Sequence, residues 1–148
     1  MTRVLPGDEE PPELFRALVE QAPDVMIYAD RSGTIRVWNR AAEHFFGYAS
    51  AEVLGKSLEI IIPERFRNAH WSGYRMAMES GRTRYAGRVL TTRSVHKNGS
   101  RLYVNLTFGM VRNSAGAVIG ALAIGRPLNG QPAGNQDPHI QSTTPPPA

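Results

Sequence analysis

The stretch VMIYADRSGTIRVWNRAAEHFFG, residues 25–47, decides the fold of this chain. It opens with two runs rich in β-branched and aromatic residues, residues 25–30 and 35–39, joined by a short glycine-containing turn. That pattern is typical of a β-hairpin. Asn39 can then cap a helix that ends at Gly47, because its amide oxygen accepts free backbone N–H groups and glycine permits a left-handed end. The stretch predicts a hairpin that runs directly into a helix.

Helices are predicted on both sides of this stretch. After it, Ser50 can cap a short helix through Leu54, and residues 64–80 are predicted to form a longer helix closed by Gly81. Before it, residues 12–22 are predicted to form a short amphipathic helix. Its apolar stripe consists of Leu14, Phe15, Leu18 and Val19.

Three further β-rich segments follow, at residues 85–95, 101–112 and 117–126. Short turns with glycine separate them, which favours an antiparallel meander. Two strands, several helices and three strands predict an α+β fold: an antiparallel sheet of about five strands with helices on one face. A pocket between the sheet and the helices is expected.

The composition limits the kinds of protein that this chain can be. The chain has 148 residues, 41% of them hydrophobic and 20% charged, as in a soluble globular domain. We expect one domain over residues 12–126, with disordered ends at residues 1–11 and a Pro-rich tail or linker at residues 127–148. No signal peptide or apolar membrane span is present, which predicts a cytoplasmic protein without membrane contact.

Two further features exclude classes of chemistry. The absence of cysteine excludes disulfides, thiolate–zinc sites and cysteinyl-flavin photochemistry. A net charge of +4, with scattered arginines, predicts no nucleic-acid binding. The carboxylates form no acid/base pair on one face, so no enzyme activity is predicted.

A candidate site lies on the predicted helix at residues 64–80. Phe66, His70, Tyr74 and Met78 follow one another at intervals of four residues, so they share one side of the helix. His70 therefore stands on a largely apolar face. A neutral imidazole in a dry slot is what an axial haem ligand requires.

From about Leu14 to Arg126 the chain resembles the PAS domain of bacterial sensor proteins. The residues that carry the resemblance are Asn39 with Ala41, Ala42 and Glu43, then Phe46-Gly47-Tyr48, Glu52, Gly55, Pro63 and the turn Lys97-Asn98-Gly99. The resemblance implies a five-stranded antiparallel sheet, a pocket for haem, flavin, a metabolite or nothing, and a role in signal sensing. It also implies a homodimer, through the N-terminal helix, and a signalling partner such as a histidine kinase or another output domain.

The segment PERFRNAH followed by GY, with Gly87-Arg88 and Leu106-Thr107-Phe108, is similar to the haem-binding PAS domains of oxygen-sensing histidine kinases. This similarity implies haem b held by His70, the one expected metal ligand. It implies that Arg88 responds to the bound diatomic gas and that the side chains of Leu106 and Phe108 narrow the space in which the gas binds.

Two alternatives stay open on the same fold. The pocket could hold an apolar metabolite or a flavin, against side chains such as Ile60, Ile62, Leu106, Phe108 and Leu122, with Tyr74 beside His70. Alternatively, the domain could bind nothing and serve only to dimerise.

Overall fold

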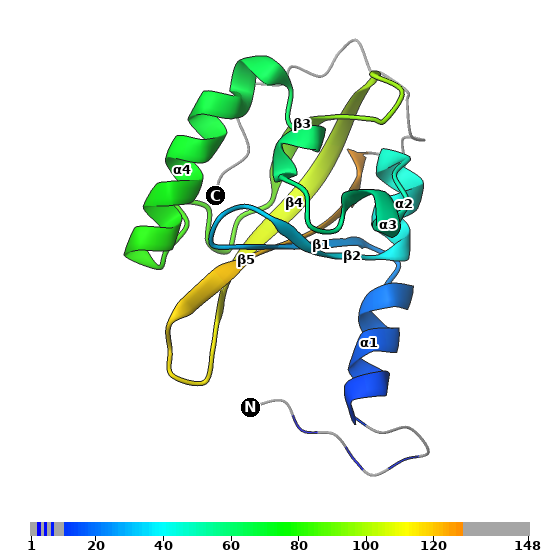
Figure 1. The fold of residues 1–148 in the computed structure, drawn as a ribbon, viewed down its shortest axis with the longest axis vertical. Helices are drawn as coiled ribbons and strands as arrows, with labels where there is room; N and C mark the ends of the chain where they lie inside the picture. Colours follow the sequence, from blue (N-terminus) through cyan, green and yellow to red (C-terminus); the bar gives the residue numbers. More distant parts are fainter. Residues whose placement is uncertain (1–2, 4, 6, 8–10, 129–148) are drawn as a thin grey trace.

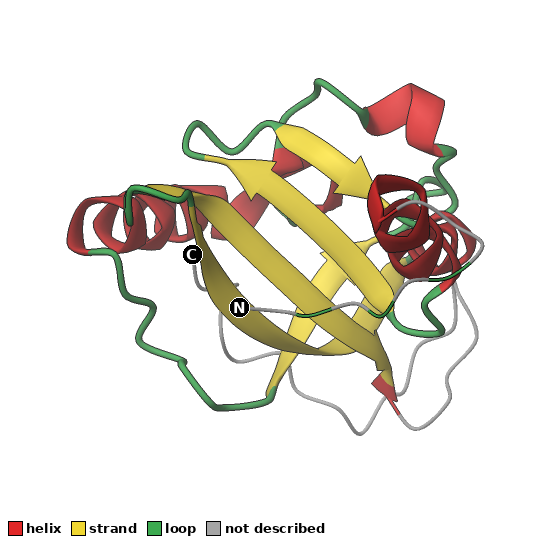
Figure 2. Ribbon diagram, turned by 90° about the horizontal axis from the view of Figure 1, so that it is seen from below, coloured by secondary structure: helices red, strands yellow, loops and turns green. Residues whose placement is uncertain are grey.

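The computed structural model describes residues 3, 5, 7 and 11–128. Its five strands form one antiparallel sheet in the order β2-β1-β5-β4-β3. They are β1 (Val25–Asp30), β2 (Ile35–Trp38), β3 (Leu90–Val95), β4 (Arg101–Arg112) and β5 (Val118–Pro127). The sheet is strongly twisted (Figure 2). The predicted five-stranded antiparallel sheet is confirmed.

The helices confirm the second half of the predicted α+β fold. They are α1 (Pro11–Gln21), α2 (Arg40–Phe46), α3 (Ser50–Val53) and α4 (Arg67–Ser80), with short 3-10 turns η1 (Leu58–Ile61) and η2 (Glu64–Phe66). The elements from α2 to α4 lie together over one face of the sheet, whereas α1 extends away from it (Figure 1). Among the described residues, no helix combines the length and the apolar character needed to cross a bilayer.

Asn39 joins three elements at one point. Its Oδ1 accepts hydrogen bonds from the backbone N–H groups of Ala42 at 3.1 Å and Met26 at 2.9 Å. Its Nδ2 donates to the carbonyls of Val19 at 3.0 Å and Asp24 at 2.9 Å. The predicted cap of α2 is confirmed, and the same side chain also fixes the end of α1 and the start of β1.

The core lies between the sheet and the helical elements in two neighbouring clusters. The larger cluster surrounds Phe46, Ile35 and Leu102, all fully buried. The smaller cluster packs Tyr74 and Met78 of α4, with Ala77, onto Ala29, Val118 and Ala121 of the sheet. Burial of these apolar side chains attaches α4 to the strands.

Several predicted boundaries change. The helix predicted over residues 64–80 begins with the 3-10 turn η2, and α4 itself starts at Arg67. Strand β3 begins at Leu90, not at residue 85, because residues 85–88 form a turn in which the N–H of Arg88 donates to the carbonyl of Tyr85 at 3.0 Å. Gly87 makes this turn possible, since its φ of 72° lies in the region that glycine favours. The cap of α3 is Ala49 and not Ser50, which is already helical. Strand β5 continues through Pro127, one residue beyond the predicted end of that strand.

The predicted disordered ends are residues 1–11 and 127–148, and apart from residues 3, 5, 7, 11, 127 and 128 they lie outside the described part. The amphipathic helix α1 is confirmed. It has no buried residue, and its Phe15 and Leu18 are 41% and 57% exposed. Its apolar side therefore has little cover within the described chain.

Candidate functional site

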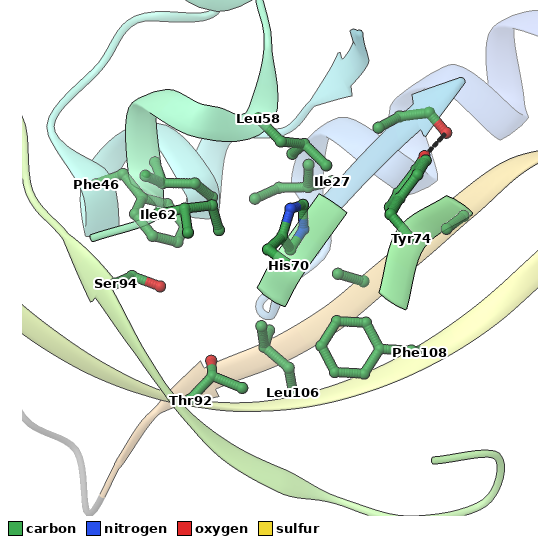
Figure 3. Close-up of a pocket in the computed structure, with 14 residues that line it drawn as sticks. Ile27, Phe46, Leu58, Ile62, His70, Tyr74, Thr92, Ser94, Leu106 and Phe108 are labelled. Atoms are coloured by element: carbon green, nitrogen blue, oxygen red, sulfur yellow. Dashed lines mark hydrogen bonds between the residues drawn. The ribbon is translucent and has the colours of Figure 1, made fainter. Parts of the chain in front are cut away.

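A cavity of about 50 Å³ lies between the inner face of the sheet and α4 (Figure 3). Most of its lining is carbon, and the polar groups among the lining side chains come from a histidine, a tyrosine, a threonine and a serine. The lining residues are Ile27, Ala29, Phe46, Leu58, Ile61, Ile62, His70, Tyr74, Thr92, Ser94, Leu106, Phe108, Ala121 and Ala123.

His70 projects from α4 into this cavity (Figure 3) and is 3% exposed. Its Nδ1 is buried and has no hydrogen-bond partner in the described chain. Burial lowers the pKa of His70 to about 4, although the carboxylate of Glu59 acts in the opposite direction. The imidazole is therefore neutral at physiological pH, and a buried nitrogen is left without a partner, which costs free energy in the ligand-free domain.

Aromatic packing sets the direction of the His70 ring. The rings of Trp71 and Tyr74 lie 4.6 and 5.8 Å from it, centroid to centroid. Trp71 donates its indole N–H to Glu59 Oε1 at 2.7 Å. The indole also lies against Gly33, where a Cβ would come within 2.3 Å of the ring. These contacts hold α4 against η1 and the turn between β1 and β2.

Tyr74 contributes its ring to the cavity but not a free hydroxyl. The hydroxyl donates toward the carbonyls of Ala29 at 3.1 Å and Asp30 at 2.5 Å. Burial, followed by the negative charge of Asp30, raises the pKa of Tyr74 far above its usual range. Tyr74 therefore ties the middle of α4 to the end of β1 and stays protonated.

We expect Tyr74→Phe to lower the free energy of unfolding by about 1 kcal/mol, because the change removes one buried donor and leaves the aromatic packing in place. Urea denaturation measures the effect. Tyr48→Phe is the matched control, since the Tyr48 hydroxyl makes no hydrogen bond to the described residues; equal losses in both variants would contradict this account of the Tyr74 hydroxyl.

Five of the residues singled out from the sequence line the cavity together: Ile62, His70, Tyr74, Leu106 and Phe108. Leu122 and Arg88 do not line it. Leu122 is on the opposite face of the sheet, because its neighbours Ala121 and Ala123 both line the cavity and side chains alternate between the two faces along β5. Arg88 is exposed, in the loop before β3, with its guanidinium 5.9 Å from the Tyr85 ring centroid.

Sequence reasoning missed Thr92 and Ser94, which line the cavity from β3. Alternation along the strand could have identified them, because residues two apart share one face. Ile60, also named as a candidate from the sequence, is half-buried and packs against the larger core cluster.

A metal ion could take one protein ligand here. Within residues 11–128 and the three described residues before them, no three His, Cys, Asp or Glu side chains form a metal-binding group. His70 alone therefore fits a metal that brings most of its own ligands, as the iron of haem does.

The fit of haem depends on chemistry and on volume. The unpartnered Nδ1 of His70 and the apolar walls suit one axial ligand and a porphyrin. The cavity in this form holds about 50 Å³, whereas ligand pockets usually hold roughly 300–1,000 Å³. A macrocycle would therefore need a larger pocket; an outward movement of α4 would provide it and would loosen the Tyr74 and Trp71 contacts.

Comparisons with known proteins find sensor proteins among the sequence relatives of this chain. Over 56 residues the chain is 36% identical to the sensor protein FixL of Bradyrhizobium diazoefficiens, and over 98 residues it is 26% identical to the oxygen sensor protein DosP of Escherichia coli. These alignments cover 38% and 66% of this chain but only 11% and 12% of the relatives. The chain thus spans about a tenth of the length of these relatives.

Solved structures share the fold. A PAS domain from Colwellia psychrerythraea superposes with a TM-score of 0.69 at 18% identity, over 82% of this chain and 100% of that one. An RNA-binding light-oxygen-voltage receptor gives a TM-score of 0.64 at 22% identity, over 86% of this chain and 36% of the other. The family model described as the PAS fold matches residues 13–128. The chain belongs to the PAS family of sensory domains.

Proposed function

We propose that this PAS domain binds haem b through His70 and senses a diatomic gas. The observation that carries the proposal is the neutral, buried imidazole of His70, whose Nδ1 has no partner and whose ring enters an apolar cavity. An unsatisfied buried nitrogen costs stability, so its presence suggests a role in binding. The similarity to a protein named as an oxygen sensor supports the same reading.

The residues around His70 have separate roles in this proposal. Bound haem would supply an iron atom that takes up a diatomic gas. Leu106 and Phe108 on β4 limit the room beside it and keep water out. Arg88 lies in the loop between α4 and β3, and we propose that it turns toward the pocket when α4 moves outward to admit the macrocycle.

Signalling is proposed to pass through protein contacts. The face of the sheet opposite the helices carries half-buried apolar side chains, among them Met26, Tyr28, Leu122 and Ile124. Helix α1 adds the exposed Phe15 and Leu18. These surfaces suit a homodimer or a contact with an output domain such as a histidine kinase.

The test is a titration of the purified protein with hemin, followed by absorption spectroscopy. We expect an intense Soret band at one hemin per chain, and His70→Ala should weaken hemin binding at least tenfold or abolish the band. His44→Ala is the matched control, because His44 is exposed and should leave the band unchanged. A band of the same intensity and affinity in His70→Ala would overturn the axial role of His70.

The small volume of the cavity favours a second candidate, an apolar metabolite or a flavin chromophore that occupies the same pocket after a smaller adjustment. Mass spectrometry of the denatured protein would detect either one. An organic molecule bound in equal amounts by the wild type and by His70→Ala would favour this second reading.

A further inference from the structure

A cluster of three arginines lies at the β3 edge of the sheet, away from the pocket. Thr92 and Ser94 point into the cavity (Figure 3), so Arg93 between them lies on the other face of β3. Arg93 pairs with Tyr103 and Val95 pairs with Arg101 across the β3–β4 ladder. Arg93 and Arg101 are therefore diagonal neighbours on one face, a position in which the Cα atoms of two residues are roughly 7–8 Å apart.

Phe66 connects the third arginine to this pair. The guanidinium carbon of Arg65 lies 4.7 Å from the centroid of the Phe66 ring, and that of Arg93 lies 6.0 Å from the same centroid. Phe66 itself is partly buried against the larger core cluster. Arg65 and Arg93 thus both lie against one ring held by the core, and Arg101 lies diagonally across the β3–β4 ladder from Arg93.

No carboxylate balances these charges within the described part of the chain. Its salt bridges join Arg36 to Asp30, Arg40 to Glu20, Lys97 to Glu52 and Arg126 to Asp24. Glu64, the sequence neighbour of Arg65, forms no salt bridge with the cluster. Arg93 Nε is buried and has no hydrogen-bond partner.

The cluster is costly without a ligand. Burial, then the charges of Arg101 and Arg65, lower the pKa of Arg93. Like charges placed together repel one another, and a buried donor without a partner lowers the stability of the fold. A bound anion would relieve both costs, and its charge would act on all three guanidinium groups.

We propose that Arg65, Arg93 and Arg101 form a binding site for an oxyanion of the phosphate class. A guanidinium donates two parallel hydrogen bonds to two oxygens of one phosphate group. Three positive charges without a counter-ion favour a dianion over a single carboxylate. The source is either free inorganic phosphate or a phosphomonoester, such as a phosphorylated side chain of a signalling partner. This proposal does not depend on which ligand the pocket holds.

Nuclear magnetic resonance tests this site directly. Inorganic phosphate and O-phosphoserine are titrated separately into ¹⁵N-labelled protein while the Nε–H resonance of Arg93 is followed. We expect a saturable shift with at least one of the two anions. Saturation by inorganic phosphate alone would identify the free ion, and at least tenfold tighter binding of phosphoserine would identify an ester.

Single substitutions assign the site. Arg65→Gln and Arg101→Gln change exposed side chains and should preserve the fold. Each should weaken the anion affinity at least fivefold. Arg93→Gln should weaken it by the same factor, provided that the spectrum of this variant is that of a folded protein. Arg82→Gln removes the same charge from an exposed position outside the cluster and should leave the affinity unchanged. The proposal is overturned if neither anion gives a saturable shift, or if Arg82→Gln weakens binding as much as the cluster variants do.

Discussion

Asn39→Ala is expected to lower the free energy of unfolding by about 3 kcal/mol. The loss of a helix cap costs about 1–2 kcal/mol, and unpaired buried backbone groups add a further 1–3 kcal/mol. Asn39 is 1% exposed, so water does not readily replace its side chain. The N–H of Met26 and the carbonyls of Val19 and Asp24 lose their Asn39 partner at the same time as α2 loses its cap. Guanidinium chloride denaturation of the ligand-free protein measures the effect.

Asn113→Ala provides the matched control. Asn113 Oδ1 also accepts two backbone hydrogen bonds, from Ala115 and Ala117 at 3.0 Å each, but in an exposed turn. Water can take over these contacts, so we expect a loss below about 1 kcal/mol. Similar losses for Asn39→Ala and Asn113→Ala would contradict the role of Asn39 as a buried junction.

The sequence predicts the individual helices and strands better than it predicts the contacts between them. Asn39 is recognisable as a cap because it directly precedes an apolar helical pattern. Its contacts with Val19 and Met26 depend on how α1 and β1 are placed relative to Asn39, and no residue spacing in the sequence predicts that placement. In the same way, the interval of four residues places His70 with Tyr74 on one side of α4, but only packing leaves the His70 nitrogen without a partner.

Residues on strands show where such predictions fail. The sequence suggests an apolar strand around Leu122 but not which residues face the pocket, and a shift of one residue reverses the face of every side chain. The register between β4 and β5 shifts between Val111 and Arg112. The sequence predicts that Arg88 lies on a strand that begins at residue 85. Because the chain turns at Gly87, β3 begins only at Leu90 and Arg88 is exposed.

Acid is expected to destabilise the ligand-free domain through His70. The pKa of His70 falls from 6.5 to about 4 on folding, so between these values the unfolded chain binds more protons than the folded one. The free energy of unfolding therefore decreases as the pH falls from above 6.5 toward 4. The contribution of His70 is roughly 3 kcal/mol over this range, since one pKa unit corresponds to about 1.4 kcal/mol.

The comparison of wild type with His70→Leu isolates this effect. Leucine fills the apolar site without a buried nitrogen, so at pH 7.5 the variant should be at least as stable as the wild type. At pH 4.5 its advantage should grow by roughly 2–3 kcal/mol, because the variant has no group at this position to protonate. The pKa of Asp30 is lowered to about 2 by hydrogen bonds from Ser32 and Arg36, which outweigh the opposing effect of burial, so it titrates below this window. Equal pH dependence of unfolding in both proteins would show that His70 is not held neutral by burial, and would remove the physical basis for the proposed binding of haem by His70.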